Sequence, residues 1–232
     1  MGLNYNPSIV SDGLVFYLDA ANTRCYSGSG LTANGLVGGI GNTLNNGVGF
    51  STSNAGYFIF DGANDFIDSN VDFGFDSTIS ATMSLWLRTT NLSQRGGILG
   101  KAGSSNWEWT LSQGIDSSGI FFWYWKVDSN VNLSISVNNF FESNIWKKVD
   151  LVWSHTANLL TLYSNGIGIT SSAPNSSSFQ NRASNISIGL GYNIFASNYW
   201  AGQMGSVYLY QRALTQQEIS QNFNATRYRY GI

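Results

Sequence analysis

Apolar and polar residues alternate most regularly between residues 146 and 166. Val149, Leu151 and Trp153 occupy every second position there, so one side of an extended strand is apolar. A second alternating run follows after a short polar break and ends at Asn165-Gly166, a pair that accepts positive φ at little cost. Another extended run follows that turn. The pattern predicts three antiparallel strands joined by tight turns.

Similar extended segments are predicted along the rest of the chain. They cover residues 14–18, 57–61, 81–89, 96–101, 106–111, 120–127, 133–137, 186–190 and 202–210. Residues 27–56 are rich in Gly and Asn but keep scattered Leu, Val and Ile, which predicts a long loop with short extended pieces packed on the domain. Thr215 and Glu218 have the spacing of a capping box and predict one short helix near the C-terminus.

The composition fits a β domain with an uncharged surface. The chain has 232 residues, of which 43% are hydrophobic and 15% aromatic, enough for a sizeable core. Only 10% are charged, against a typical ~25%, and Asn, Ser and Gly together supply roughly a third of the chain. Such a surface favours contact with another protein surface or with neutral sugars. Because nucleic acid requires basic patches, we expect no nucleic-acid partner.

Several stretches resemble laminin-G-like domains of the concanavalin A-like lectin/glucanase superfamily. One is the strand and turn that end at Tyr163-Ser164-Asn165-Gly166, and another is FDGANDFI at residues 60–67. SDGLVFYLDAAN at residues 11–22, with Tyr26-Ser27-Gly28-Ser29-Gly30 after it, is similar to the opening strand of such modules in virion proteins of tailed bacteriophages. SVYLYQRAL at residues 206–214 is the strongest single match. The resemblance covers nearly the whole chain.

The resemblance and the strand pattern imply an all-β fold, a two-sheet antiparallel jelly-roll sandwich of concanavalin A-like type with one short C-terminal helix. We expect an N-terminal arm at residues 1–13, the sandwich at residues 14–226 and an extended tail at residues 227–232. Cys25 is the single cysteine, so no disulfide forms within the chain. No apolar run approaches ~18 residues, so we expect no membrane span.

The leading functional hypothesis is a non-enzymatic bacteriophage virion structural protein displayed on the particle surface. It would be a head decoration or cement protein, or a fibre or tail component, and its partners would be other virion proteins. The start of the chain lacks the features of a secretory signal, and release by lysis within a virus particle would bring a lectin-like domain outside the cell. We expect a homo-oligomer, a trimer in particular. The alternative is a carbohydrate-binding module that recognises host surface polysaccharide.

Catalytic residues are not expected. His155 is the only histidine and stands in a tight turn, and Cys25 has the character of an ordinary packed residue. Glycosidases of the superfamily that the chain resembles carry two closely spaced acids on one strand. Here Glu108 stands alone between Trp107 and Trp109, so the sequence argues against hydrolysis of that type.

A calcium site is a secondary hypothesis. Five aspartates lie within residues 61–76, and Asp61 and Asp65 are the best-placed pair. Ca²⁺ prefers six to eight oxygen ligands, but Asp is also common where strands end in turns, which needs no ion. Relatives often carry an acidic pair before the last strand, where this chain has Gly205 and Ser206. We therefore expect no obligatory cofactor.

The aromatic hairpin is the candidate sugar site. Trp107, Trp109, Trp123 and Trp125 concentrate flat rings that could stack on the C–H faces of a sugar. Residues 121, 123 and 125 share one face of their strand and residues 122 and 124 the other, so at least one of these sets belongs to the core.

Both ends of the chain are candidate contact segments. Tyr5 and Ile9 in the arm could lie across a neighbouring molecule, or the arm could simply fray. Arg227, Tyr228, Arg229 and Tyr230 alternate cations and rings, a composition favoured at interfaces. This tail is expected to dock either on its own sandwich or on a neighbouring subunit.

Overall fold

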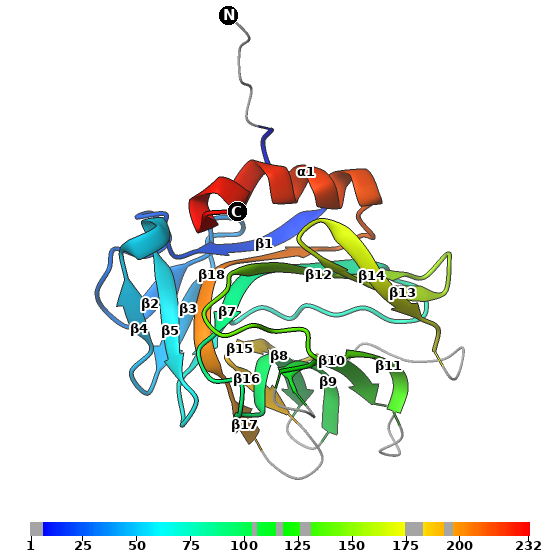
Figure 1. Cartoon of the computed structure of the whole chain (residues 1–232), viewed down its shortest axis with the longest axis horizontal. Coiled ribbons are helices and arrows are strands. Elements are labelled where there is room, and N and C mark those ends of the chain that lie inside the picture. The colour runs from blue at the N-terminus through cyan, green and yellow to red at the C-terminus, as the bar shows by residue number, and fades with distance from the viewer. Residues whose placement is uncertain (1–6, 104–105, 115–117, 126–130, 175–182, 193–196) are drawn as a thin grey trace, which may run out of the picture.

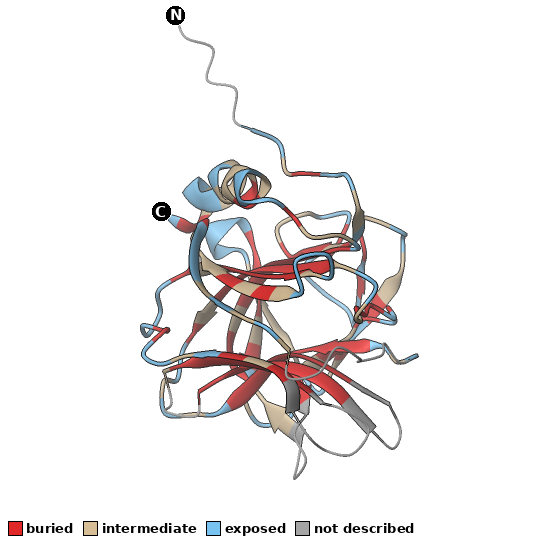
Figure 2. Ribbon diagram, turned by 90° about the vertical axis from the view of Figure 1, so that its right-hand side faces the viewer, coloured by how far each residue is buried: buried red, intermediate tan, exposed pale blue. Residues whose placement is uncertain are grey.

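The computed structural model describes residues 7–103, 106–114, 118–125, 131–174, 183–192 and 197–232. In this part of the chain two antiparallel sheets pack face to face, and one short α-helix lies outside them (Figures 1 and 2). The predicted two-layer sandwich with a C-terminal helix is thereby confirmed. The helices among the described residues are too short or too polar to cross a lipid bilayer.

The first sheet has, in spatial order, β14 (Ile167–Ser172), β13 (Leu159–Ser164), β12 (Lys147–Ser154), β7 (Ala81–Thr89), β18 (Ala201–Tyr210), β5 (Tyr57–Asp61) and β4 (Gly49–Ser51), while β1 (Leu14–Asp19) also pairs with β18. The second has β11 (Val131–Val137), β10 (Ile120–Trp125), β9 (Asn106–Gln113), β8 (Gly96–Gly103), β15 (Ile186–Ile188), β6 (Phe66–Asp68), β3 (Gly41–Asn45) and β2 (Thr32–Asn34). β16 (Leu190–Tyr192) and β17 (Ser197–Tyr199) form a separate hairpin. The helical elements are η1 (Ser53–Ala55), α1 (Gln216–Thr226) and η2 (Arg227–Tyr230).

Strict alternation along the central strands builds the core between the sheets. On β12, Val149, Leu151 and Trp153 are buried in the main hydrophobic cluster, as their spacing predicts. Figure 2 shows the buried residues concentrated on the facing sides of the two layers. The turn after β13 uses Asn165 at φ 50° and Gly166 at φ 82°, the positive values that this dipeptide favours.

A second, smaller core covers the outer face of the first sheet. α1 lies across this face on the side away from the second sheet (Figure 1), and η2 and residues 7–13 pack beside it. The cluster consists of Val10, Tyr57, Trp86, Trp146, Val152, Tyr208, Tyr210, Leu214, Ile219 and Tyr230. The predicted capping box starts α1, because the Thr215 side chain accepts the Glu218 amide while Glu218 bonds back to the Thr215 amide.

The outer face of the second sheet is covered differently. The β16–β17 hairpin packs directly on β8 and also contacts β9. Its backbone lies so close that a Cβ atom on Gly97 would stand 1.8 Å from the Gly191 nitrogen. Only glycine permits this approach.

Candidate functional site

An aromatic surface lies on the outer side of β10. Phe122 and Tyr124 are buried between the sheets, so Phe121 and Trp123 point to the opposite side. Their ring centroids are 4.6 Å apart at an interplanar angle of 44°. Phe121 is buried, whereas Trp123 keeps part of its surface exposed. Trp123 is therefore the ring of this pair that a ligand can reach.

Arg95 completes this surface from the segment before β8. Its guanidinium carbon lies 5.3 Å from the Phe121 ring centroid and 5.7 Å from that of Trp123, within cation–π range. The Arg95 side chain is exposed. Arginine carries planar N–H donors that suit hydroxyl or carboxylate groups, so an apolar ring and a charged donor stand side by side.

Small hydroxyl side chains border the two rings. The sheet register places Ser136 and Ser112 on either side of Phe121, and Ser134 and Thr110 on either side of Trp123. Two of these hydroxyls lie next to the β16–β17 hairpin, since a Cβ atom on Gly191 would stand 2.6 Å from Thr110 Oγ1 and 3.1 Å from Ser112 Oγ. Ser136, on the other side, is exposed. We call Arg95, Phe121, Trp123, Ser134 and Ser136 the β10 platform.

Of the other three tryptophans of the predicted sugar site, the structure describes the side chain of Trp109. Trp109 is completely buried and packs among core rings, 6.5 Å from Phe75 and 6.1 Å from Phe122 between centroids. The prediction that Trp109 binds sugar is wrong, because it belongs to the inward face of β9. The side chains of Trp107 and Trp125 lie outside the described residues.

Glu108 is buried and forms an ionic group with the buried Lys101 and the exposed Asp72. Lys101 Nζ lies 2.6 Å from Asp72 Oδ1 and 3.5 Å from Glu108 Oε2. The Tyr124 hydroxyl donates to Glu108 Oε1 over 3.3 Å. A cation thus stands between the two carboxylates, so Glu108 is arranged as a structural partner of Lys101.

Asp61 and Asp65 come together at the turn between β5 and β6. Asp65 Oδ2 accepts the Asp61 amide over 3.1 Å, and Asp61 Oδ1 accepts the amide of Ala63 over 2.8 Å. Asp65 Oδ1 is buried and has no hydrogen-bond partner among the described residues. Burial raises the pKa of Asp65, and the charge of Asp61 adds to this effect. No group of three or more His, Cys, Asp or Glu side chains placed to hold a metal ion occurs in the described residues.

The C-terminal tail packs on its own chain. Residues 227–230 form the short helix η2, so the prediction of an extended tail is wrong. Tyr230 is buried and stacks on Trp86 with centroids 4.2 Å apart, and Arg229 Nη1 lies 2.7 Å from Asp19 Oδ1. The tail thus takes the first of its two expected positions, against the sandwich. Arg229 and Tyr230 are not available to a neighbouring subunit, whereas Arg227 and Tyr228 are exposed.

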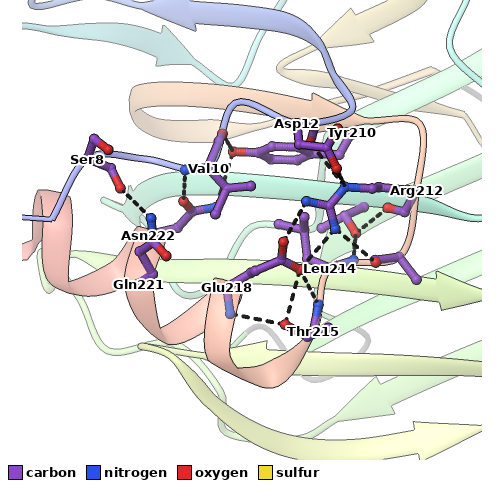
Figure 3. Close-up of polar contacts among 12 residues, drawn as sticks. Ser8, Val10, Asp12, Tyr210, Arg212, Leu214, Thr215, Glu218, Gln221 and Asn222 are labelled. Atoms are coloured by element: carbon purple, nitrogen blue, oxygen red, sulfur yellow. Dashed lines mark hydrogen bonds and ion pairs between the residues drawn. The ribbon is translucent and has the colours of Figure 1, made fainter.

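The N-terminal arm is also held within the chain from residue 8 onward (Figure 3). The Val10 amide donates to Asn222 Oδ1 over 2.8 Å, and Gln221 Nε2 donates to the Ser8 carbonyl over 2.8 Å. Ile9 is partly buried against the second core, and its predicted contact with a neighbouring molecule stays a prediction. Tyr5 lies outside the described residues.

Two reactive residue types take ordinary structural positions. Cys25 is buried, and burial raises the pKa of its thiol to about 11, so it stays protonated near neutral pH. His155 is exposed in the turn between β12 and β13, as predicted, and its Nδ1 lies 2.8 Å from Ser80 Oγ.

Sequence reasoning missed Arg95 and the serines of the platform. Arg95 is distant from β10 along the chain, and only the pairing of β8, β9 and β10 brings it to the rings. The available signal was the alternation on β11, which places Ser134 and Ser136 on one face beside β10.

Comparison with known proteins agrees with this architecture. The family model described as the concanavalin A-like lectin/glucanases superfamily matches residues 61–220. Sequence comparison with curated proteins finds no match. Among solved structures, the binding domain of Paraclostridial Mosquitocidal Protein 1 is 19% identical, over 92% of this chain and 52% of its own, with a TM-score of 0.70.

Two botulinum neurotoxin structures are similarly related. The serotype D binding domain is 14% identical over 91% of this chain and 51% of its own, with a TM-score of 0.69. The serotype D ligand binding domain in complex with N-acetylneuraminic acid is 15% identical over 91% of this chain and 50% of its own, with a TM-score of 0.65. This chain spans about half the length of these structures. At such identities the likeness shows a shared fold.

Proposed function

Since the chain belongs to the concanavalin A-like lectin/glucanases superfamily, we propose that it is a lectin-like carbohydrate-binding module that recognises a surface polysaccharide. The β10 platform carries this proposal. It combines the exposed part of the Trp123 ring with the Arg95 guanidinium and a border of serine hydroxyls. Ring faces suit sugar C–H groups, while guanidinium and hydroxyl groups fix sugar oxygens. The toxin binding domains with the same fold support the choice of a binding role.

The test is a glycan and polysaccharide array probed with the purified chain and two variants. Trp123→Ala removes the reachable ring of the platform, and we expect it to abolish the signal. Tyr228→Ala is the matched control, because Tyr228 is an aromatic residue with 63% of its surface exposed on η2, away from the platform. Equal binding by wild type and Trp123→Ala would refute the platform as the sugar site.

The module works, in this proposal, without catalysis. Glu108 is buried against Lys101, so its carboxylate is engaged in a charge pair. Members of the family that hydrolyse sugars need two acids placed about a substrate bond. Release of reducing sugar from any glucan, lost on Glu108→Gln substitution, would overturn this part of the proposal.

We further propose that the module is displayed on the surface of a tailed-bacteriophage particle, as a head decoration, fibre or tail component. The resemblance at residues 11–22 and 206–214 motivates this setting. An exposed apolar edge supports contact with other proteins, because Ile167 and Ile169 on edge strand β14 are 67% and 46% exposed. Mass spectrometry of purified particles tests the location. Sedimentation of wild type and Ile167→Lys tests the proposed trimer, which the substitution should weaken.

We also propose that Ca²⁺ can bind at Asp65. The unpartnered Asp65 Oδ1 is the atom best placed to gain from a cation, and Asp61 supplies a second carboxylate. We expect millimolar Ca²⁺ to raise the melting temperature of wild type and to leave Asp65→Asn unchanged. An identical response of both proteins would remove Asp65 from consideration.

A further inference from the structure

A small pocket lies on the opposite side of the sandwich from the β10 platform. It has a volume of about 250 Å³ and is formed between the segment after β1 and the segment from β4 to η1. Figure 1 shows β4 and β11 at opposite ends of the molecule. The residues that matter here are Ala20, Thr23, Tyr26, Phe50, Thr52 and Ala55. We call it the Tyr26 pocket.

One wall of the Tyr26 pocket is aromatic. The Tyr26 and Phe50 rings meet edge to face with centroids 5.2 Å apart, and Phe58 supports Tyr26 from the core at 5.3 Å. The Tyr26 hydroxyl donates to the Gly30 carbonyl over 2.9 Å, which fixes the ring and leaves the oxygen able to accept. The wall is therefore rigid before any ligand binds.

The opposite wall is a backbone turn in an unusual conformation. Asn54 and Ala55 have φ values of 49° and 64°, in the left-handed region that Ala seldom adopts. The turn is pressed against the segment after β1, since a Cβ atom on Gly56 would stand 2.7 Å from the Ala20 carbonyl oxygen. Residues held in this way often mark a functional surface, because the surrounding structure must enforce them.

Arg229 enforces this turn from the C-terminal end of the chain. Its Nε donates to the Asn54 carbonyl over 3.0 Å and its Nη2 to the Gly56 carbonyl over 2.7 Å. Its Nη1 pairs with Asp19 Oδ1, which also accepts the Ala21 amide over 3.0 Å. One guanidinium thus joins the turn to the segment after β1.

The lining chemistry selects an uncharged ligand. The residues that line the pocket contribute hydroxyls, methyl groups, ring carbons and backbone, and none of them carries a charged side chain. The volume falls below the ~300–1,000 Å³ of pockets for drug-sized ligands, so it suits a single small ring. Apolar ring edges combined with several hydroxyl groups match the alternating C–H and O–H groups of a sugar.

We infer that the Tyr26 pocket is a second carbohydrate subsite, which takes one uncharged sugar ring, and that Arg229 is a positioning residue for its wall. The inference rests on the proposed carbohydrate-binding function and extends it. Two subsites at opposite ends of one domain would let the module bridge polysaccharide chains, or bind one surface with greater avidity than either site alone.

The experiment is an amide NMR titration of the full chain with methyl glycosides of neutral hexoses, and with cyclohexanol as an apolar probe. We expect the glycosides to shift the amide signals of Gly28, Thr52 and Ala55. Thr52→Val keeps the shape of the side chain but removes its hydroxyl, and should weaken binding at least fivefold. Thr156→Val, an exposed threonine in the β12–β13 turn, is the matched control and should bind like wild type.

A conservative variant isolates the role of Arg229. Arg229→Lys can keep the charge pair with Asp19 but not the fork of bonds to the Asn54 and Gly56 carbonyls. We expect the pocket affinity to fall while the melting temperature changes little, a split that a purely structural role would not produce.

The outcomes separate this inference from the proposed function. Shifts confined to Arg95 and Trp123 would overturn the pocket and leave the platform standing. Shifts at the pocket alone would support the inference and count against the platform. Pocket shifts by cyclohexanol equal to those by glycosides would overturn the sugar assignment, and no pocket shift with any glycoside would overturn the inference altogether.

Discussion

On the outer face of the first sheet, the side chains of β7, β12 and β18 lie beneath α1, η2 and residues 7–13. On the outer face of the second sheet, Arg95, Trp123 and Ser136 still reach solvent. Both faces carry aromatic rings, but the β16–β17 hairpin covers the second face only over β8 and β9 and leaves part of Trp123 exposed. Rings that are covered contribute to stability, and rings that remain open can contribute to binding.

The covered face also buries charge. Lys148 Nζ pairs with Asp150 and bonds Ser84 Oγ at 2.7 Å, and both charged side chains are completely buried. Burial lowers the pKa of Lys148, and the charge of Asp150 opposes this effect. Such a pair is tolerated only when each charge stays compensated, so this face has little freedom to evolve a ligand site.

The largest expected difference between the faces is in the free energy of unfolding. Trp86 is completely buried and stacks on Tyr230, so Trp86→Ala should cost about 4 kcal/mol. Trp123→Ala should cost about 1 kcal/mol, because this ring keeps part of its surface exposed in the folded protein. Urea unfolding of both variants measures the contrast. Similar losses would show that the second sheet's outer face is structural too.

The arm provides a finer test of the covered face. Asn222 Oδ1 accepts from the Val10 amide over 2.8 Å, and Asn222 Nδ2 donates to the Tyr210 hydroxyl over 3.1 Å (Figure 3). Asn222→Ala removes both hydrogen bonds. We expect a loss of about 2 kcal/mol from these buried polar groups. Asn224→Ala, at an exposed position on the same helix, should change stability by less than about 0.5 kcal/mol. Equal effects of the two substitutions would mean that the arm contributes nothing to the fold.

The start of α1 should make the covered face sensitive to acid. The Arg212 guanidinium, together with Thr215, lowers the pKa of Glu218 from 4.5 to about 2. Because the folded value lies below the unfolded one, this stabilisation is present above about pH 4.5 and is lost as the pH falls toward 2. For a partly exposed pair we expect about 1 kcal/mol. Unfolding measured between pH 6 and pH 2 should show a smaller decline for Glu218→Gln than for wild type.

The alternation of apolar and polar residues predicted the strands of the two sheets better than it predicted which side chains are exposed. Strands at residues 57–61 and 81–89 have the predicted bounds, because each alternates cleanly between a core side and an outer side. The segment at residues 27–56 holds β2, β3 and β4 as short extended pieces, as expected. Trp109 was misassigned because rings occur on both faces of its hairpin, so alternation alone cannot tell which side is core.

The two ends of the chain show what a local pattern cannot reveal. The alternation of Arg and Tyr at residues 227–230 resembles a strand, but Tyr230 turns inward because Trp86 offers it a stacking surface. Gly205 leaves room for this, since a Cβ atom there would stand 2.2 Å from the Tyr230 hydroxyl. These partners are far apart in sequence. Long-range contacts of this kind also created the β10 platform and the Tyr26 pocket.

The smallest expected effect on stability, and the sharpest test of the open face, is at Arg95. Its side chain is exposed, so Arg95→Gln should change the free energy of unfolding by about 0.5 kcal/mol or less. Binding should respond differently for different ligands. An acidic polysaccharide should lose affinity and salt dependence on substitution. A neutral one should lose less affinity, because the glutamine amide can still donate a hydrogen bond to a hydroxyl group but cannot form an ion pair with a carboxylate. If the affinity for both ligands falls equally, Arg95 acts by orienting the Trp123 ring, and the platform recognises the shape of the sugar and not its charge.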